Sequence, residues 1–438
     1  MIYILLSERI HISNDYSVHA PLTVFQPVDQ DLALTNGLVM VCRKMNCNRA
    51  GAACCLIACK LHPNQLTMKL IKAWSVVFIF FALMSNTTLA QSPDISIDLT
   101  STDVVSQGQT GTCWSFSTTS FLESESHRIT GELHDFSEMA AVRVVYPEKV
   151  ERYVRYQGKH QFGPGGLSHD VTHAAAAYGL VPQSIYDGGQ APGQYDHGAL
   201  DASLEALAKT MVGQSGSIAQ ESFDAVEAVL DAHLGALPES FEYDEKSYTP
   251  VSFRDAMGID PEAYVTVTSF THHPFGAPFI LEVPDNHAHG AFWNVPLDDL
   301  ERMVSDALSD GYTVAWDADV SNRGFSFQNG WAIMPEAAAS AKEWETLGQM
   351  PDELSVSQAM RQSAFDSQEN TDDHLMHIVG LAKDAQGRTY FMIKNSWGQG
   401  NAFGGRQFVS MSYFRHHTIG IMLHEDGLSK TDRKAMGR

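Results

Sequence analysis

The sequence predicts an α+β fold with two lobes, because helical patterns fill the first half of the chain and strand patterns the last third. Residues 113–128 contain no Gly or Pro and are followed by Gly131, as expected for a helix and its C-terminal stop. Residues 294–320 change from apolar spacings of three and four to the run YTVAW, as in a helix, a turn and a strand. Helices and strands that are segregated in this way are typical of α+β proteins.

The remaining elements follow from the same patterns. We predict helices at 137–156, at 167–178 and at two places within 190–240, the second around 222–234. Residues 241–295 are rich in Pro, His and aromatic residues and are predicted to be loop-rich, and 336–364 are predicted to be a mixture of helix and loop. Strands are predicted at 374–382, 389–394, 407–411 and 418–423, with a turn at 384–387 between the first two.

The first 90 residues differ from the rest of the chain. A basic segment at 68–72 precedes an uncharged apolar run at 73–84, and TLA at 88–90 supplies small residues before a cleavage site. These are the parts of a secretory signal peptide, and the run is too short to cross a membrane. We therefore predict an upstream extension or wrongly assigned start at 1–67, a signal peptide at 68–90, and an exported (periplasmic or secreted) chain at 91–438 without a stable membrane anchor. The alternative is a cytosolic N-terminal region followed by a buried helix.

Loss of this leader leaves one cysteine. Five of the six cysteines lie at positions 42, 47, 54, 55 and 59, so Cys113 alone remains after cleavage. An exported chain with a single cysteine has no disulfide framework, and a free thiol is a liability in an oxidising compartment. Cys113 is therefore either a chemical nucleophile or a small buried hydrophobe at the start of a helix. At a helix N-terminus the free N–H groups favour the thiolate, so we expect the pKa of Cys113 to be lowered.

A thiolate nucleophile needs an imidazole to accept its proton and a third group to orient that ring. With a turn at 384–387, His374 lies nearly opposite Asn395 across the predicted hairpin, within a contact distance of roughly 5 Å. The asparagine could accept the ring N–H and hold one tautomer. Taken alone, such a cross-strand pair could equally be structural.

Five sequence blocks, in order, resemble those of papain-like cysteine peptidases: QGQTGTCW at 107–114, FSE at 136–138, GPGG at 163–166, HLMHIVG at 374–380 and KNSWG at 394–398. The resemblance implies a papain-like two-lobe fold, with a helical left lobe and a β-barrel-like right lobe. It also implies one role for each of the residues that match: Cys113 as nucleophile, His374 as base, Asn395 as orienting group, Gln107 as oxyanion-hole donor and Trp397 as a shield over the Asn–His bond.

Gly165 and Gly166 would, in the same context, let an extended substrate backbone approach closely, because glycine places no side chain in the way. The motif at 163–166 alone would also be explained by a turn before a helix.

Two longer segments, at 234–253 and 294–320, resemble the bleomycin hydrolase and aminopeptidase C branch, which carries a helical insertion, here at about 190–295. The resemblance covers about 101–426. It implies a cysteine peptidase that acts on peptide substrates, preferentially as an aminopeptidase, and that needs no cofactor. It also implies that the protein can form a homo-oligomer. An endopeptidase stays open as the alternative. Thr110 stands where many secreted relatives have a second cysteine, and 16 residues between Ala90 and Gln107 are too few for a folded propeptide. The branch is typically intracellular, and its C-terminal arm is longer than residues 427–438.

Charge and spacing exclude other classes. A formal net charge of −23 argues against nucleic acid as a partner. The histidines at 272–273, 287, 289 and 416–417 lack the spacing of a known site with a carboxylate or third histidine, so no metal site is predicted. We expect Asp372 and Asp373 to form a solvated acidic loop, and Glu123 and Glu125 to be surface or structural residues. The competing function is a weak or inactive homologue that binds peptides or partners, against which the intact Cys113, His374, Asn395 and Gln107 argue.

Overall fold

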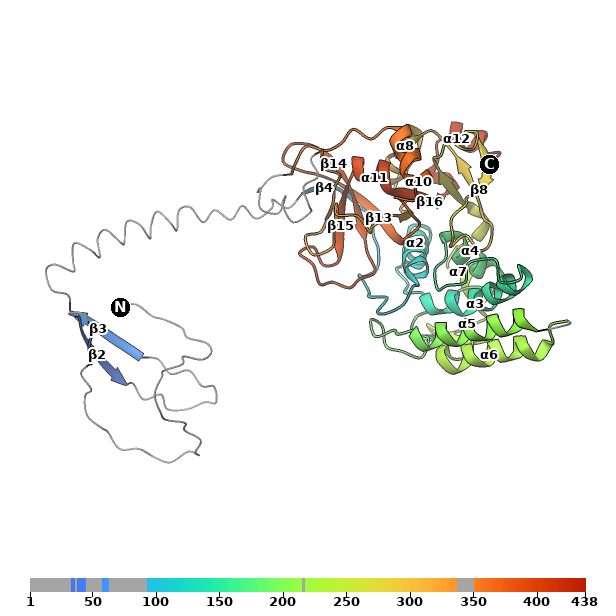
Figure 1. The fold of residues 1–438 in the computed structure, drawn as a ribbon, viewed down its shortest axis with the longest axis horizontal. Coiled ribbons are helices and arrows are strands. Elements are labelled where there is room, and N and C mark those ends of the chain that lie inside the picture. The colour runs from blue at the N-terminus through green and yellow to red at the C-terminus, as the bar shows by residue number, and fades with distance from the viewer. Residues whose placement is uncertain (1–32, 36–37, 45–56, 63–92, 215–216, 337–349) are drawn as a thin grey trace, which may run out of the picture. The chain divides into compact units, whose positions relative to one another are not determined.

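The structure is a computed structural model that describes residues 33–35, 38–44, 57–62, 93–214, 217–336 and 350–438 (Figure 1). The chain divides into two compact units, Met1–Thr87 and Thr88–Arg438. The first unit contains an antiparallel sheet of β1 (Ala33–Thr35), β2 (Leu38–Lys44) and β3 (Ile57–His62). The predicted signal peptide at 68–90 lies outside the described residues. Within the described part of the chain, we find no helix with the length and apolar character that a membrane span requires.

Helices dominate the first half of the second unit, as the sequence predicts. They are α2 (Cys113–Thr130), α3 (Glu138–Arg155), α4 (Ser168–Ala177), α5 (Gly198–Gly213) and α6 (Gln220–Leu234). Helix α2 ends where Gly131 adopts a left-handed conformation with a φ of 81°. Helices α5 and α6 pack on α3, and Arg143 of α3 pairs with Glu227 and Asp231 of α6 at 2.6 and 2.7 Å.

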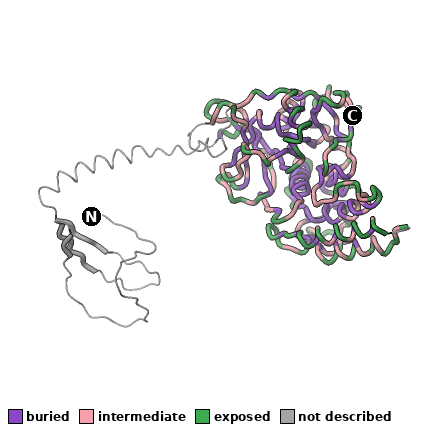
Figure 2. Tube along the Cα trace, viewed as in Figure 1, coloured by how far each residue is buried: buried purple, intermediate pink, exposed green. Residues whose placement is uncertain are grey.

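Helix α2 is buried on all sides along most of its length, from Cys113 to Ser126. Figure 2 shows it as a purple coil within the second unit. Its buried face toward the strands contacts β13 (His374–Lys383), while its other faces meet α3 and α4. Small Ser and Thr side chains make this close packing on every face feasible. The helix that begins at Cys113 therefore forms the boundary between the helical and β-rich parts.

The β-rich part is one large sheet, in the order β11-β12-β15-β14-β13-β10-β16-β7-β9-β8, with β4 (Asp94–Asp98) paired onto β13. Besides β13, the described strands from residue 314 onward are β10 (Val314–Ala318), β11 (Phe325–Ser326), β12 (Trp331–Ala332), β14 (Thr389–Lys394), β15 (Arg406–Ser410) and β16 (Thr418–His424). The path does not close on itself among the described residues, so barrel-like describes it only loosely. The predicted α+β class is confirmed.

The region 241–295 is loop-rich, as predicted, but several short elements lie between its loops. It contains β5 (Phe241–Tyr243), β6 (Lys246–Tyr248), α7 (Pro250–Ala256), β7 (Tyr264–Thr268), β8 (Ala277–Ile280) and β9 (Ala291–Asn294). Strand β7 pairs with β16 and extends the main sheet. Its sequence, YVTVT, is rich in β-branched residues. The surrounding Pro and His residues, which mark turns, obscured so short a strand.

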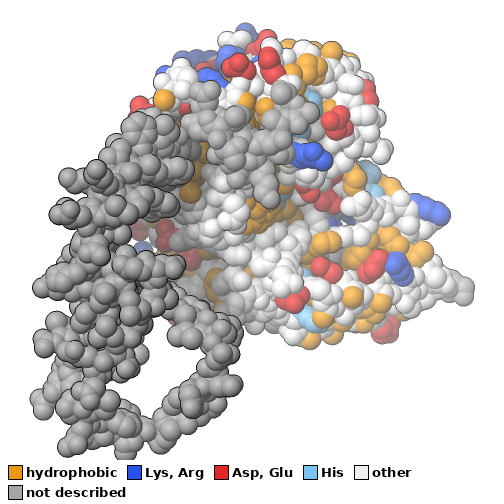
Figure 3. Space-filling model, turned by 60° about the vertical axis from the view of Figure 1, so that its left-hand side comes forward, with side chains coloured by type: hydrophobic (Ala, Val, Ile, Leu, Met, Phe, Trp, Pro, Cys, Tyr) orange, Lys and Arg blue, Asp and Glu red, His pale blue; other side chains and the backbone are white. Residues whose placement is uncertain are grey.

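The predicted helix and strand around Gly311 are confirmed as α8 (Leu297–Ser309) and β10. Helix α8 buries Leu300, Met303, Val304 and Ala307, the spacing of three and four that predicts one apolar face. The C-terminal part adds α10 (Gln358–Asp366), α11 (Met411–His417) and α12 (Lys430–Ala435). On the face shown in Figure 3, described acidic and basic side chains are interspersed among uncharged ones.

The hairpin of β13 and β14 forms with the predicted turn. Its register pairs His377 with Lys394 and Ile378 with Ile393, followed by an irregularity before Gly380. The ladder ends at Lys394, so Asn395 is the first residue beyond the strand. On its other side β13 pairs with β10, with His374 opposite Ala318. These pairings fix His374 at the end of a strand that has neighbours on both sides.

Candidate active site

A cavity of about 390 Å³ lies where the start of α2, the loop between α3 and α4, and the first residue of β13 meet. Its described lining residues are Gln107, Thr110, Gly111, Cys113, Gln161, Gly163, Pro164, Gly165, Asp285, Val320, Asp373, His374 and Trp397. Five of the seven residues singled out from the sequence thus line one cavity. The other two, Asn395 and Gly166, lie directly behind lining residues.

The hydrogen bonds of Asn395 determine the tautomer of His374. The backbone N–H of Ser396 donates to Asn395 Oδ1 over 2.7 Å, which identifies that atom as the amide oxygen. On its other side Asn395 Nδ2 donates to Gln407 Oε1, also over 2.7 Å. His374 Nε2 lies 2.8 Å from Asn395 Oδ1 and must be the donor in this bond. Neutral His374 therefore carries its proton on Nε2 and keeps the lone pair of Nδ1 free to accept another.

Trp397 covers this pair. Its indole stacks on the His374 imidazole, with 4.6 Å between ring centroids and 29° between the planes. Phe325 and Phe327 in turn meet the indole edge to face at 5.7 and 5.5 Å. His374 is only 4% exposed, whereas Trp397 is 37% exposed. The indole thus forms the solvent-facing layer over the imidazole.

The side chain of Gln107 is held in place from both ends of its amide. Its Oε1 accepts from the Ser396 hydroxyl over 2.6 Å, and its Nε2 donates to the Thr110 carbonyl over 2.7 Å. The Gln107 backbone N–H also donates to the Ser396 carbonyl over 2.9 Å. Because an amide nitrogen has two hydrogens, one N–H of Gln107 remains for a group in the cavity.

Burial sets the protonation of the thiol and the imidazole. It raises the pKa of Cys113 to about 12, against the opposing effect of the Leu375 backbone N–H, while the nearby Asp317 carboxylate raises the pKa further. The expected lowering of this pKa is wrong for this structure, because burial outweighs the N–H groups around the sulfur. Burial also lowers the pKa of His374 to about 4. Burial therefore favours the uncharged form of each group.

Gly165 and Gly166 are required by close contacts. A Cβ at Gly165 would overlap the Asp285 carboxylate, and one at Gly166 would lie 3.0 Å from the Trp114 ring. The loop is fastened to α2, since Trp114 Nε1 donates to the Pro164 carbonyl over 3.0 Å. The buried Lys149 amine donates to the carbonyl of Gly165. The two glycines thus belong to one rigid segment, of which Gly165 lines the cavity as the glycine wall.

Of the two acidic residues before His374, Asp373 is exposed, as expected for a solvated loop, whereas Asp372 is not. Asp372 is partly buried, its pKa is raised to about 7 by burial, and it accepts the backbone N–H of Asp285 over 2.9 Å. Asp373 lines the cavity and accepts the backbone N–H of Val320 over 3.2 Å. The loop at 281–290 folds back onto this segment and provides the partner, which local sequence does not reveal.

Glu123 and Glu125 are structural residues rather than surface ones. Glu123 is 2% exposed and accepts from the Thr102 hydroxyl and the Phe136 backbone N–H. Glu125 is 1% exposed and pairs with Arg128 at 2.7 Å. Of the two predicted readings, the structural one is confirmed.

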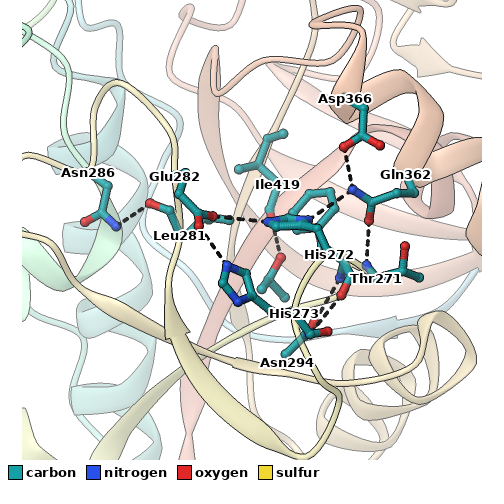
Figure 4. A network of polar contacts seen from close by, with 12 residues as sticks. Thr271, His272, His273, Leu281, Glu282, Asn286, Asn294, Gln362, Asp366 and Ile419 are labelled. Carbon is teal, nitrogen blue, oxygen red and sulfur yellow. Dashed lines mark hydrogen bonds and ion pairs between the residues drawn. The ribbon is translucent and has the colours of Figure 1, made fainter.

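One histidine pair does have a carboxylate partner, which corrects the sequence-based expectation. Glu282 lies 3.1 Å from His272 Nε2 and 2.7 Å from His273 Nε2, in the network of Figure 4. The Gln362 amide oxygen accepts the Thr271 N–H, so its nitrogen must donate to His272 Nδ1 over 3.0 Å. The proton of neutral His272 is then on Nε2, the atom that would face an ion. This network is therefore satisfied as a hydrogen-bonded cluster.

Sequence reasoning missed three residues that complete the cavity. Ser396 and Gln407 orient Gln107 and Asn395 respectively, and Asp285 reaches the cavity from a distant loop. Ser396 lies inside the KNSWG block, so its position beside Asn395 was a usable signal. Gln407 and Asp285 carry no local signal, because only the folded sheet and loop bring them here.

The fold and this cavity define a papain-like cysteine peptidase. Comparison with solved structures supports the fold: the crystal structure of pepw from Lactobacillus rhamnosis HN001 superposes with a TM-score of 0.64 at 17% identity, covering 86% of this chain and 95% of that one. The chain belongs to the peptidase C1-like family, whose model matches residues 148–438. The match begins after Cys113, so it does not include Gln107 or the thiol.

Curated relatives extend over more of the chain. Aminopeptidase G of Lactobacillus delbrueckii subsp. lactis is 24% identical over 382 residues, which cover 78% of this chain and 85% of the relative. Aminopeptidase C of Lactococcus lactis subsp. cremoris is 24% identical over 392 residues, covering 79% and 86%. The resemblance to the bleomycin hydrolase and aminopeptidase C branch is thereby confirmed.

Proposed function

We propose that this protein is a cysteine aminopeptidase that hydrolyses peptide bonds through a Cys-His-Asn mechanism. The observation that carries the proposal is the tautomer of His374. With Nε2–H donated to Asn395, the Nδ1 lone pair is the basic site of a ring that lines the same cavity as Cys113. The aminopeptidase preference is supported by the names of the two relatives above.

The steps follow from this arrangement. As Cys113 Sγ attacks the substrate carbonyl carbon, its proton passes to His374 Nδ1, because both groups start uncharged. The carbonyl oxygen becomes an oxyanion, to which the free Gln107 N–H and the Cys113 backbone N–H would donate; one such donor contributes about 10²–10³ in rate. The imidazolium then protonates the leaving amine as the C–N bond breaks, which leaves a thioester. Water, deprotonated by His374, hydrolyses the thioester and regenerates the thiol.

The test compares wild type with Cys113→Ala and His374→Ala, using a peptide with a free N-terminus. We expect hydrolysis to be abolished in Cys113→Ala while the far-ultraviolet circular dichroism and thermal midpoint stay near wild type. Alkylation of Cys113 by iodoacetamide should be slower in His374→Ala, which lacks the proton acceptor. Retained turnover in Cys113→Ala would contradict the assignment. Equal alkylation rates in wild type and His374→Ala would favour the peptide-binding homologue instead.

Export of the chain from residue 91 onward belongs to the same proposal. It is supported by the basic, apolar and small-residue segments at 68–90. Expression of the full sequence in a bacterial host, fractionation, and N-terminal sequencing of the product would test it. We expect a product that begins near Gln91 outside the cytoplasm, and an uncleaved cytoplasmic chain would contradict export.

A further inference from the structure

One carboxylate in the cavity has no part in the mechanism above. Asp285 lies in the loop between β8 and β9, and its carboxylate packs so closely against Gly165 that a Cβ there would overlap it. Its Oδ1 accepts from Gln161 Nε2 over 3.0 Å. In the described part of the chain, its Oδ2 has no hydrogen bond, and no Lys, Arg or His nitrogen lies within 4 Å of the carboxylate. Asp285 thus offers a free acceptor atom beside the glycine wall.

The loop that carries Asp285 is held before any ligand arrives. The Asp285 backbone N–H donates to Asp372 over 2.9 Å. Next to it, the Asn286 side chain donates to the Leu281 carbonyl over 2.8 Å, the bond drawn at the left of Figure 4, and exchanges two bonds with Gly290. His287 Nε2 lies 3.1 Å from the buried carboxylate of Asp170. Three consecutive residues are therefore anchored, which fixes the position of the Asp285 carboxylate.

A second carboxylate close by is buried and unpartnered. Asp317 of β10 is 3% exposed, and neither of its side-chain oxygens has a hydrogen-bond partner among the described residues. Its charge and that of Asp285 both raise the pKa of the Cys113 thiol, so both carboxylates lie near the nucleophile. Because burial raises the pKa of Asp317 itself well above its ordinary range, Asp317 favours its neutral form, and Asp285 is the better placed of these two groups to pair with a cation.

The ionisable groups that line the cavity also favour a cationic ligand over an anionic one. Its ionisable lining groups are Asp285, Asp373, His374 and Cys113, with no Lys or Arg in the described lining. Asp285 and Asp373 each accept one hydrogen bond and keep one oxygen free among the described residues, but Asp285 is half-buried and packs against Gly165, whereas Asp373 is exposed. A peptide substrate brings one obligatory cation to an aminopeptidase, the α-ammonium group of its first residue.

We propose that Asp285 binds the α-ammonium group of the substrate's N-terminal residue and so restricts the enzyme to peptides with a free N-terminus. The inference rests on the proposed function and names the residue that sets its specificity. A charge-assisted hydrogen bond between ammonium and carboxylate would hold the first residue against the Gly165 wall. An acetylated peptide loses the positive charge and brings a carbonyl oxygen toward the carboxylate, which disfavours its binding.

The test measures kcat/KM for two peptides of the same sequence, one with a free and one with an acetylated N-terminus. Wild type, Asp285→Asn and the matched control Asp373→Asn are compared, and iodoacetamide labelling of Cys113 reports an intact site in each. Asparagine keeps an oxygen for Gln161 but removes the charge. We expect Asp285→Asn to lower kcat/KM for the free peptide roughly 10- to 100-fold and to leave or raise that for the acetylated one. Asp373→Asn should keep the wild-type preference.

The outcomes separate this inference from the proposed function. If wild type prefers the free peptide and Asp285→Asn retains that full preference, the Asp285 assignment is wrong while the peptidase assignment stands. An equal loss for both peptides in Asp285→Asn, with labelling unchanged, would also contradict the role in N-terminal recognition. Hydrolysis of both peptides by wild type at similar rates would refute both the anchor and the aminopeptidase preference. If wild type hydrolyses neither peptide, the proposed function and the anchor are both wrong.

Discussion

The hydroxyl of Ser396 is predicted to support catalysis only through Gln107. The structure gives it one side-chain bond, 2.6 Å to Gln107 Oε1, while the Ser396 backbone N–H separately holds Asn395. Ser396→Ala removes the first bond and keeps the second. A net hydrogen bond between neutral groups contributes about 0.5–1.5 kcal/mol, which corresponds to a roughly 2- to 12-fold fall in kcat. Removal of the donor itself in Gln107→Ala should cost about 10²–10³.

Two assays distinguish this positioning role from general damage to the site. Alkylation by iodoacetamide uses the same thiol and imidazole but develops no oxyanion, so Ser396→Ala and Gln107→Ala should alkylate at the wild-type rate. In the double variant, loss of the Ser396 hydroxyl should add nothing to the effect of Gln107→Ala, because the two residues act as a unit. Slowed alkylation in Ser396→Ala, or a multiplicative loss in the double variant, would refute the reasoning.

Three further predictions concern the His374 imidazole, the indole that covers it and the buried carboxyl of Glu138. Because burial lowers the pKa of His374 to about 4, kcat/KM should fall only as the pH drops through about 4, and a limb near pH 6.5 in a pH–rate profile would contradict this. Trp397→Ala opens the His374–Asn395 bond to water and should lower kcat/KM on the order of 10-fold in steady-state assays. Because His374 is then less buried, its pKa should rise and the acidic limb of the pH–rate profile should move to higher pH. A limb at the wild-type pH would contradict the shielding role. Burial raises the pKa of Glu138 to about 8, so the folded state retains a proton that the unfolded state loses above about 4.5, and stability falls as the pH rises through this window. Glu138→Gln should reduce the loss of stability between pH 5 and pH 9 by on the order of a few kcal/mol in urea titrations at the two pH values, whereas an unchanged loss would show that Glu138 is not its source.

Local pattern was sufficient for the parts of the site that lie on one hairpin. The hairpin ends its ladder at His377 and Lys394, and Asn395, the next residue, reaches His374 through its side chain because the separation along the chain is short. The start of α2 at Cys113 follows equally from the absence of breakers between it and Gly131. These are properties of neighbouring residues, which a single sequence displays.

Other parts depend on contacts that the sequence does not display. Asp285 reaches the cavity only because the strands β8 and β9 fold the loop between them onto the segment before His374. The carboxylate partner of His272 and His273 lies across a turn nine to ten residues further on. The pKa of Cys113 was predicted in the wrong direction because helix placement is local, whereas burial comes from β13 and the loops around it.

The position of β13 in the chain has a consequence for when activity can arise. Helix α2 contacts β13 across a long stretch of sequence, as in the bond between Ser120 and His377, 257 residues apart. A chain still being synthesised, or one truncated before β13, contains the thiol and the glycine wall but neither the base nor the group that orients it. Contacts of such separation form late in folding, because their loop-closure entropy is large. We therefore expect Cys113 to gain peptidase activity only after the C-terminal strands have been synthesised and the whole domain has folded.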